Sequence, residues 1–402
     1  MAVFYGPMSL NRQNAGPADR LGRPLVRSVA VIGGGLAGVC VARALARAAH
    51  RADRVDLAVT LFEASAGLAM GASAVPVAVL HPLDSRDNNL ASQFYAQGVE
   101  TTMAWARALG GAASGWADLS GVDQYTVPGL KAPSRQPGGW VQPSSFIRAC
   151  LEDVRAHLGG RFRLALGQGV GPGQWKELQG GFDAVVVACA EDSLLAQAGL
   201  ALQPLAGQLS SWAIAPDHLP AVCQRFPRVA CGQGFVTPVI DGRIFFGATF
   251  HRGRRQTVVT GEDHRANLTQ LEALWPLAER AFLFDPERLG GWAGVRFATR
   301  DRLPHIGQPV AASAYKDGHS SWRLARSVSR LQQLPRDPGV YVLLGLGARG
   351  LSTAPLGATA LAADLLGLPP VLPPRLRNAV DPGRFVLREH ARAQGDGRLD
   401  GP

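Results

Sequence analysis

A chain of 402 residues is long enough for one large or two medium domains, and its 47% hydrophobic and 18% charged residues exclude an intrinsically disordered protein. The net charge of +10 is compatible with a polyanionic partner, but a bias in base composition explains it equally well, because nearly all the basic residues are arginine. No segment approaches about 18 consecutive apolar residues, so the sequence predicts no membrane-spanning helix.

The cysteines and the first residues of the chain indicate a compartment. Five cysteines are scattered without C-x-x-C spacing, which argues against a disulfide framework and against a structural zinc site. Residues 1–26 contain no apolar run typical of a signal peptide. We therefore expect a reducing, cytoplasmic location and no bound metal. The cysteines are Cys40, Cys150, Cys189, Cys223 and Cys231.

The first elements alternate between strand and helix after a flexible leader at 1–26. Residues 28–32 form a short apolar run that is typical of a buried parallel strand, and a glycine-rich turn follows it. Residues 39–49 are rich in alanine and have helical spacing, and a second strand over 59–62 ends at Glu63. This order predicts a βαβ unit.

The middle of the chain mixes both kinds of element. We expect helices over 84–115 and 146–157, short strand-like pieces over 117–145, and a buried strand over 182–188. Between 203 and 250, short apolar runs alternate with Gly, Pro and Asp, which is typical of antiparallel strands.

The last third returns to the α/β pattern. We expect a helix over 261–284, a polar surface insertion over 311–336, a buried strand over 340–344 and a helix over 354–366. Residues 388–402 are expected to form a disordered tail.

Because the parallel pieces enclose the antiparallel ones, the sequence predicts an α/β fold with one domain inserted into another. A Rossmann-type domain, with a parallel sheet flanked by helices, is expected to comprise residues 27–100, 140–202 and 295–387. An α+β substrate domain built on an antiparallel sheet is expected to comprise residues 101–139 and 203–294.

The turn after the first strand has the spacing Gly33-x-Gly35-x-x-Gly38. Gly33 allows a tight turn, Gly35 lets the backbone approach a pyrophosphate, and Gly38 lets helix and strand pack closely. Leu36 and Ala37 lie within this turn and are also expected to contact the cofactor, and the helix that follows favours phosphate through its N-terminal amides and dipole. This pattern predicts a dinucleotide site.

Glu63 ends the second strand, at a slightly longer spacing from the glycine turn than is usual. A carboxylate at this place accepts hydrogen bonds from ribose hydroxyls and repels a 2′-phosphate. We therefore expect FAD or NAD rather than NADP.

A second glycine-rich turn favours FAD over NAD. The strand at 340–344 leads into the segment GLGARGL and then into a helix, so backbone amides can face the anionic edge of a reduced flavin. A plain left-handed turn is the alternative explanation. The flavin contacts expected here are Gly345, Gly347, Ala348, Arg349, Gly350 and Leu351.

Several longer motifs resemble a known family. They are VIGGGLAG, LFEASAGLAMGAS, GGWVQPSSFIRACL, FDAVVVACA, LAGQLS, GFVTPVIDGRIFFGATF, GVRFATRDRLPHIG and LGLGARGLSTAPL. With these motifs the chain resembles the D-amino-acid-oxidase-like flavoproteins over about residues 28–385. It is most similar to their MnmC branch, the oxidoreductase half of bacterial enzymes that modify the wobble uridine of tRNA.

The resemblance implies FAD, a tRNA partner and a particular reaction. In 5-carboxymethylaminomethyl-(2-thio)uridine, the methylene between nitrogen and carboxylate would lose a hydride to the flavin. The imine would then hydrolyse to glyoxylate and the 5-aminomethyl nucleoside.

The resemblance also implies roles for individual residues. Arg296, in the GVR segment, would clamp the substrate carboxylate bidentately, unless it serves as a structural partner of Asp301. Arg349 would stabilise reduced flavin or contact the same carboxylate. Ser73 and Ala188 would lie beside the cofactor.

Two departures from the family leave alternatives open. The methyltransferase half is absent, so a separate methyltransferase would act on the product. The stretch 74–81 lacks the Asn-Arg-type pair expected beside the flavin. An FAD-dependent oxidase of free glycine or sarcosine-like amines and a non-catalytic tRNA-binding flavoprotein are the alternative functions. His81 and His305 are assigned no role.

Overall fold

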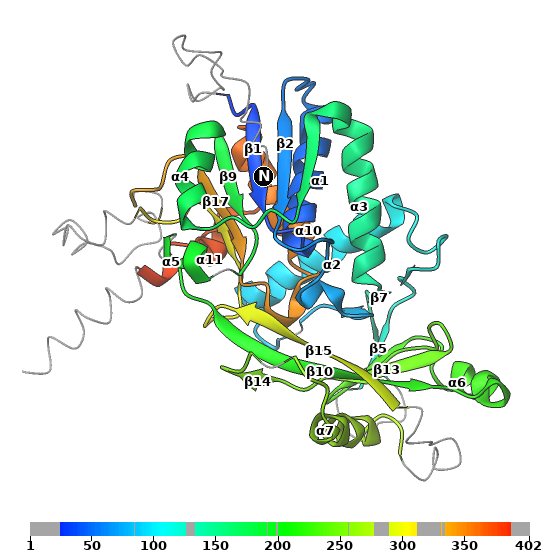
Figure 1. Ribbon diagram of the computed structural model, residues 1–402. Coiled ribbons are helices and arrows are strands. Elements are labelled where there is room, and N and C mark those ends of the chain that lie inside the picture. Colours follow the sequence, from blue (N-terminus) through cyan, green and yellow to red (C-terminus); the bar gives the residue numbers. More distant parts are fainter. Residues whose placement is uncertain are drawn as a thin grey trace, which may run out of the picture.

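The computed structural model describes residues 25–83, 85–125, 133–190, 192–197, 200–255, 257–276, 289–311, 331 and 334–386. Figure 1 shows a parallel sheet with helices on both faces, next to a layer of antiparallel strands. Most of the expected leader and insertion, and the expected tail at 388–402, lie outside the described residues.

The parallel sheet has the strand order β16-β17-β9-β1-β2-β8. Neighbouring strands run parallel, except that β16 is antiparallel to β17. The carboxyl ends of the parallel strands therefore meet at one edge, which is where open α/β sheets bind ligands. The strands are β1 (Ser28–Ile32), β2 (Ala58–Glu63), β8 (Phe162–Leu166), β9 (Ala184–Val187), β16 (His305–Gly307) and β17 (Val340–Leu344).

Helices cover both faces of this sheet because successive strand residues point to opposite sides. Val29 and Val31 pack into a large cluster with α1, α2, α3, α10 and α11, whereas Ala30 and Ile32 pack into a second cluster with α4 and α5. The helices are α1 (Leu36–Arg51), α2 (Leu90–Ala108), α3 (Pro143–Leu158), α4 (Pro172–Gly181), α5 (Asp192–Gln197), α10 (Ala354–Leu365) and α11 (Pro374–Val380).

The antiparallel layer is built around β10, which pairs with β15 on one edge and with β13 and β14 on the other. Trp212, Ile244 and Phe246 from these strands form a core with residues at the C-terminal end of α7. The elements are β5 (Val122–Gln124), β6 (Ser134–Gln136), β10 (Gln203–Ala213), β11 (Val229–Cys231), β12 (Phe235–Val236), β13 (Arg243–Gly247), β14 (His251–Arg252), β15 (Leu289–Ala298), α6 (Leu219–Arg225) and α7 (Gly261–Glu272).

A third, small sheet has the order β3-β7-β4. Its strands are β3 (Ala78–Leu80), β4 (Ala117–Asp118) and β7 (Gly139–Val141). The stretch 74–81, singled out in the sequence, thus includes an ordered strand.

The predicted fold class is confirmed, but two helices are shorter than predicted. Helix α2 spans Leu90–Ala108, whereas the sequence predicted a helix over 84–115. Helix α7 ends at Glu272, whereas the sequence predicted a helix to residue 284. Leu274 and Trp275 are still buried, but Pro276 follows them, and proline disfavours a helical conformation in the residue before it. Residues 277–288 lie outside the described residues.

Strand β15 is continuous across residue 295, where the sequence predicted a change of domain. Its whole length, including Arg296, pairs with β10 of the antiparallel layer. Among the described helices, none has both the length and the hydropathy that a bilayer span needs. All five cysteines lie in the described residues, and none of them forms a disulfide there.

Helix α2 lies so close to the turn before α10 that only glycine fits at one position. A Cβ on Gly98 would be 1.7 Å from the carbonyl oxygen of Ser352. One turn further along α2, the Thr102 hydroxyl donates a hydrogen bond to the carbonyl of Leu351. The helix therefore supports the turn that follows the second glycine-rich segment.

We expect Gly98→Ala to lower the free energy of unfolding by about 1–3 kcal/mol, because the new methyl group forces α2 and the turn apart. Urea denaturation measures the change. Gly173→Ala, on an exposed part of α4 where a Cβ meets no atom within 4 Å, is the matched control and changes stability by less than about 1 kcal/mol. Equal stability of the two variants would contradict the close packing.

Candidate functional site

A cavity of about 1070 Å³ extends from the carboxyl ends of the parallel strands to the antiparallel layer. Both glycine-rich turns line it, and so do Glu63, Ala188, residues of the stretch 74–81 and Arg296. The structure thus brings residues that are far apart in the sequence to one site.

The first glycine turn has the shape that its spacing predicts. Gly33 has a φ of 113°, and a Cβ there would be 2.9 Å from the carbonyl oxygen of Ala188. A Cβ on Gly38 would be 1.9 Å from the carbonyl oxygen of Gly33, so Gly38 permits the strand and α1 to pack closely. Gly38 itself does not line the cavity, whereas Gly33, Gly35, Leu36 and Ala37 do.

Gly35 is the open face of this turn. A Cβ built on it meets only the Ser73 hydroxyl within 4 Å, at 3.2 Å. The same hydroxyl accepts a hydrogen bond from the Leu36 amide at 3.0 Å. Ser73 therefore lies at the N-terminus of α1, where the backbone amides and the helix dipole favour an anion.

The Glu63 carboxylate faces the glycine turn. Its Oε2 accepts a hydrogen bond from the Gly34 amide at 2.6 Å, and its Oε1 accepts one from the Ser65 amide at 2.8 Å. These bonds fix the carboxylate while leaving lone pairs for further donors, because an ionised carboxylate can accept about four hydrogen bonds. The geometry suits a ribose diol.

The second glycine turn is joined directly to the antiparallel layer. Ala298, the last residue of β15, forms an isolated antiparallel bridge with Leu346. Gly345 has a φ of 72°, and a Cβ there would be 2.7 Å from the Thr299 side chain. The turn that was expected to meet the flavin ring therefore adjoins the strand that holds Arg296.

Arg349 joins this turn to the stretch 74–81. Its Nη1 donates a hydrogen bond to the carbonyl oxygen of His81 at 3.0 Å, and its guanidinium lies 5.3 Å from the centre of the Tyr95 ring. Burial lowers the pKa of Arg349, and the nearby Tyr95 and Cys231 act in the opposite direction. Arg349 also lines the cavity.

His81 lines the cavity beside Arg349. Burial, together with the positive charge of Arg349, lowers the pKa of His81 to about 4. The imidazole is therefore neutral near pH 7.

Arg296 is a half-buried cation on the wall of the cavity. Within the described part of the chain its guanidinium makes no hydrogen bond and no ion pair, and it lies 4.7 Å from the centre of the Phe250 ring. Burial lowers the pKa of Arg296 to about 10, so the side chain stays charged at neutral pH.

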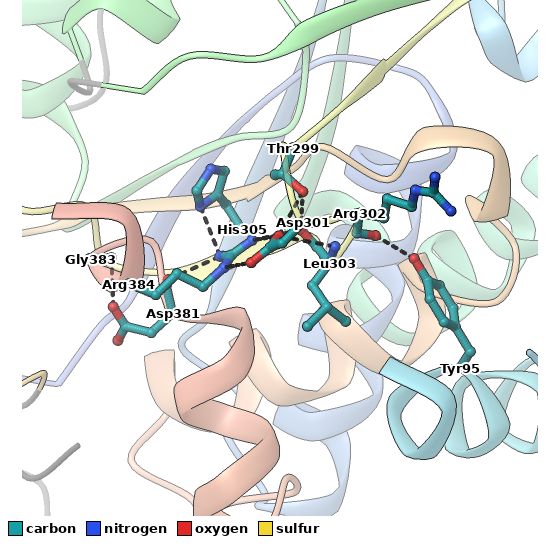
Figure 2. A network of polar contacts seen from close by, with 9 residues as sticks. All are labelled: Tyr95, Thr299, Asp301, Arg302, Leu303, His305, Asp381, Gly383 and Arg384. Carbon is teal, nitrogen blue, oxygen red and sulfur yellow. Dashed lines mark hydrogen bonds and ion pairs between the residues drawn. The ribbon is translucent and has the colours of Figure 1, made fainter. Parts of the chain in front are cut away.

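Asp301, the alternative partner of Arg296, is bound elsewhere. Figure 2 shows that Arg384 donates hydrogen bonds to both Asp301 oxygens, each at 2.9 Å. A further Arg384 nitrogen lies 3.1 Å from Nδ1 of His305. This buried network joins the segment after β15 to the C-terminal part of the described chain, and it explains His305 as a structural residue.

These features fit a dinucleotide with a flavin ring. The open face at Gly35, the fixed Glu63 carboxylate and the second turn follow one another along the cavity. Among the residues that the structure describes, no group of three His, Cys, Asp or Glu side chains is placed to hold a metal ion.

Comparison with known proteins identifies the family. The profile of the family described as FAD dependent oxidoreductase, DAO, matches residues 28–122 and 100–364. The chain belongs to this family. FAD is therefore confirmed as the cofactor of this flavoprotein, and its family resemblance is confirmed as well.

Curated relatives of the flavoprotein include bifunctional enzymes. It is 33% identical to the tRNA 5-methylaminomethyl-2-thiouridine biosynthesis bifunctional protein MnmC of Burkholderia thailandensis, over 90% of its own length and 60% of that protein. It is 32% identical to MnmC of Azoarcus sp., over 92% and 62% respectively. The flavoprotein thus spans about three fifths of these relatives.

Solved structures share the fold. Glycine oxidase of Geobacillus kaustophilus matches with a TM-score of 0.60 and 19% identity, covering 88% of the flavoprotein and 97% of the oxidase. L-proline dehydrogenase of P. horikoshii matches with a TM-score of 0.62 and 15% identity, covering 90% and 98%. At this identity the likeness concerns the fold alone.

Part of the cavity lining was not predicted from the sequence. Residues 168–172 follow β8 and lie beside Glu63, and the Gln168 amide donates a hydrogen bond to the Glu63 carbonyl. Their signal was present, since the glycine-rich segment GQGVGPG follows a strand of the parallel sheet. Phe250 and Trp292 were also missed, because nothing local distinguishes a cavity aromatic from a core aromatic.

We expect Gly35→Val to reduce FAD retention strongly, because a branched side chain there projects toward the cavity between Ser73 and the pyrophosphate position. The flavin-to-protein absorbance ratio measures retention, and thermal unfolding of the apoprotein checks that the fold persists. Gly173→Ala is the control with full flavin content. A normal flavin content in Gly35→Val would remove Gly35 from the cofactor site.

We expect the stability of the protein to fall as the pH drops from about 6.5 towards 3, with His305 as one cause. Burial, and then the charge of Arg384, lowers the pKa of His305 to about 3, so the unfolded state binds a proton that the folded state rejects. One such group contributes a slope of at most about 1.4 kcal/mol per pH unit.

His305→Asn tests this cause, because an amide oxygen can still accept from Arg384 but does not titrate. Unfolding free energies measured between pH 5 and pH 6.5 should show a shallower slope for this variant. Gly173→Ala, which changes no titratable group, should keep the slope of the wild type. An unchanged slope in His305→Asn would show that His305 titrates normally in the folded state.

Proposed function

We propose that this flavoprotein oxidises the C–N bond of 5-carboxymethylaminomethyl-(2-thio)uridine at the wobble position of tRNA. The products are the 5-aminomethyl nucleoside and glyoxylate. The observation that supports this reaction most directly is Arg296, a half-buried guanidinium on the cavity wall without an anionic partner among the described residues. Burying a charge without a partner is costly, so a substrate anion is its natural counterpart.

A carboxylate is the anion that suits Arg296 best. A guanidinium holds a carboxylate through two parallel hydrogen bonds, which fix both distance and angle. Arg296 lies two residues before Ala298, which forms the bridge with Leu346. A carboxylate bound to Arg296 therefore stays close to the second glycine turn. An α-amino carbon next to that carboxylate is then held near the flavin position.

The names of relatives agree with an N-substituted glycine as substrate class. Curated relatives are named for 5-methylaminomethyl-2-thiouridine biosynthesis in tRNA. Structures with the same fold include glycine oxidase and iminodiacetate oxidase. We therefore assign the flavoprotein to oxidoreductases that act on CH–NH groups.

Held by the two glycine turns and Glu63, FAD would supply a two-electron oxidant that takes a hydride, that is two electrons and one proton, from the methylene between nitrogen and carboxylate. The substrate nitrogen loses its proton as the C=N bond forms, and water then cleaves this bond to give glyoxylate and the primary amine. Arg296 orients the carboxylate throughout. The neutral imidazole of His81 adds no positive charge beside the amine, which must be unprotonated to react.

The proposal places the flavoprotein in the cytoplasm with tRNA as its partner. The primary amine that it releases is a substrate for a separate methyltransferase. Exposed arginines near the cavity, such as Arg252 and Arg254, supply positive charge for phosphates. Arg255 forms an ion pair with Asp192 at 2.8 Å and therefore supplies less positive charge for phosphates.

The test is to incubate the FAD-loaded protein with tRNA that bears the carboxymethylaminomethyl nucleoside. We expect equimolar glyoxylate and a nucleoside mass lower by the carboxymethyl group. Arg296→Ala should retain FAD but lose at least about 100-fold in kcat/KM, because removing one partner of a desolvated charge pair leaves the carboxylate unbound. The kcat/KM of Arg296→Lys should lie between those of the wild type and Arg296→Ala, since an ammonium is a single point charge.

Arg51→Ala, exposed at the far end of α1, is the control for overall charge and should keep full turnover. Turnover of glycine or sarcosine without turnover of tRNA would favour a small-amine oxidase. Binding of tRNA without oxidation would favour a non-catalytic flavoprotein. Unchanged turnover in Arg296→Ala would remove Arg296 from the site.

A further inference from the structure

Strand β15 presents an aromatic side chain and a guanidinium on the same face. Residues at alternate positions of a strand point to one side, so Trp292, Gly294 and Arg296 share a face. Trp292 and Arg296 both line the cavity. A Cβ on Gly294 would be 2.2 Å from the Trp292 ring, so the indole lies across the glycine on the side of the strand that holds Arg296.

A second glycine on the neighbouring strand completes this arrangement. Gly207 of β10 lies directly opposite Gly294 in the ladder. A Cβ on Gly207 would be 2.4 Å from Nη2 of Arg296. Two facing glycines therefore make room for the indole and the guanidinium, and any side chain at either position would displace one of them.

Phe250 also contacts Arg296. Its ring centre is 4.7 Å from the guanidinium carbon, it lines the cavity, and it is 53% exposed. Within the described part of the chain it is the one aromatic among the strongly exposed large hydrophobic residues. An exposed aromatic ring at the mouth of a cavity is typical of a binding surface.

We propose that Phe250 and Trp292 form a subsite for a planar ring, with Arg296 beside them as the carboxylate clamp. The proposal rests on the proposed function and specifies how that site selects its substrate. The ring it takes is the uracil base, which carries the reacting amine and the carboxylate on one short chain of two methylenes and a nitrogen.

The chemistry of the wall favours a ring-bearing substrate over glycine. Glycine and sarcosine present no apolar face that could stack on a ring. An indole and a phenyl group beside the clamp therefore add little to their binding affinity. A nucleobase has two π-faces, and stacking on aromatic side chains is how single-stranded nucleic acids are commonly bound. Figure 1 shows β15 on the side of the antiparallel layer that is nearer the parallel sheet, so a stacked base lies at the entrance to the flavin site.

Three substrates of the FAD-loaded protein separate ring recognition from carboxylate recognition. They are an anticodon stem-loop with the carboxymethylaminomethyl nucleoside, N-benzylglycine, and sarcosine. N-benzylglycine keeps the ring, two methylenes, amine and carboxylate without RNA, and sarcosine lacks the ring. We expect Phe250→Ala and Trp292→Ala each to reduce kcat/KM for both ring-bearing substrates by about 10-fold or more, mainly through KM.

Any effect of these variants on Arg296 is shared by sarcosine, so the ratio of kcat/KM for N-benzylglycine to that for sarcosine should fall by about 5-fold or more. Phe250→Tyr and Trp292→Phe keep a π-face, so they should restore kcat/KM for the ring-bearing substrates. Val258→Ala, a similarly exposed apolar residue outside the cavity lining, is the matched control and should leave all three substrates unaffected.

Binding gives a second readout that needs no turnover. Benzylthioacetate and methylthioacetate have sulfur in place of nitrogen, so they bind as substrate analogues without losing a hydride to the flavin. Calorimetry should show tighter binding of benzylthioacetate than of methylthioacetate in the wild type. Both alanine variants should abolish this preference.

The outcomes distinguish the two proposals. If the wild type oxidises N-benzylglycine but not the stem-loop, and the variants lose the ring preference, the subsite stands and the tRNA assignment fails. If the stem-loop is oxidised equally well by wild type and both alanine variants, the subsite fails and the tRNA assignment stands. Equal binding of the two thioethers by the wild type would also overturn the subsite.

Discussion

The pairing register between β10 and β15 is the constraint on which the rest of the site depends. It places Arg296 opposite Leu205 and Gly294 opposite Gly207, so that guanidinium and indole share one face of β15, and both Trp292 and Arg296 line the cavity. A shift of one residue would turn this whole set of side chains to the other face of the sheet. The Ala298–Leu346 bridge then connects the end of β15 to the second glycine turn, which brings clamp and cofactor site together.

Much of the fold was accessible from the sequence because its elements have strong local signals. Buried parallel strands such as Val340–Leu344 are continuous apolar runs, and glycine-rich turns mark where they end. The end of α7 was predicted too far along the chain, because the leucine spacing continues past Pro276 and hides the effect of this proline. The continuity of β15 across residue 295 depends on pairing with β10, which no local pattern reveals.

In the candidate site too, some residues could be predicted from the sequence and others could not. The first glycine turn and Glu63 were predictable, since a turn between strand and helix and an acid at the next strand end have fixed geometry. Arg296 was singled out by resemblance, and the structure adds that Asp301 is already bound to Arg384. The aromatic residues beside Arg296 were not predictable, because Phe250 comes from a different strand connection and meets the arginine only in three dimensions.

The interleaved order of the parallel sheet has a consequence for synthesis on the ribosome. Strand β1 pairs with β9, and β9 pairs with β17, which begins at residue 340. The side of β9 that pairs with β17 therefore stays unpaired until most of the polypeptide has left the exit tunnel. Pairing across such long sequence separations is slow to form. The nascent chain consequently exposes the unpaired edge of β9 for much of translation, and this edge is where chaperone protection matters most.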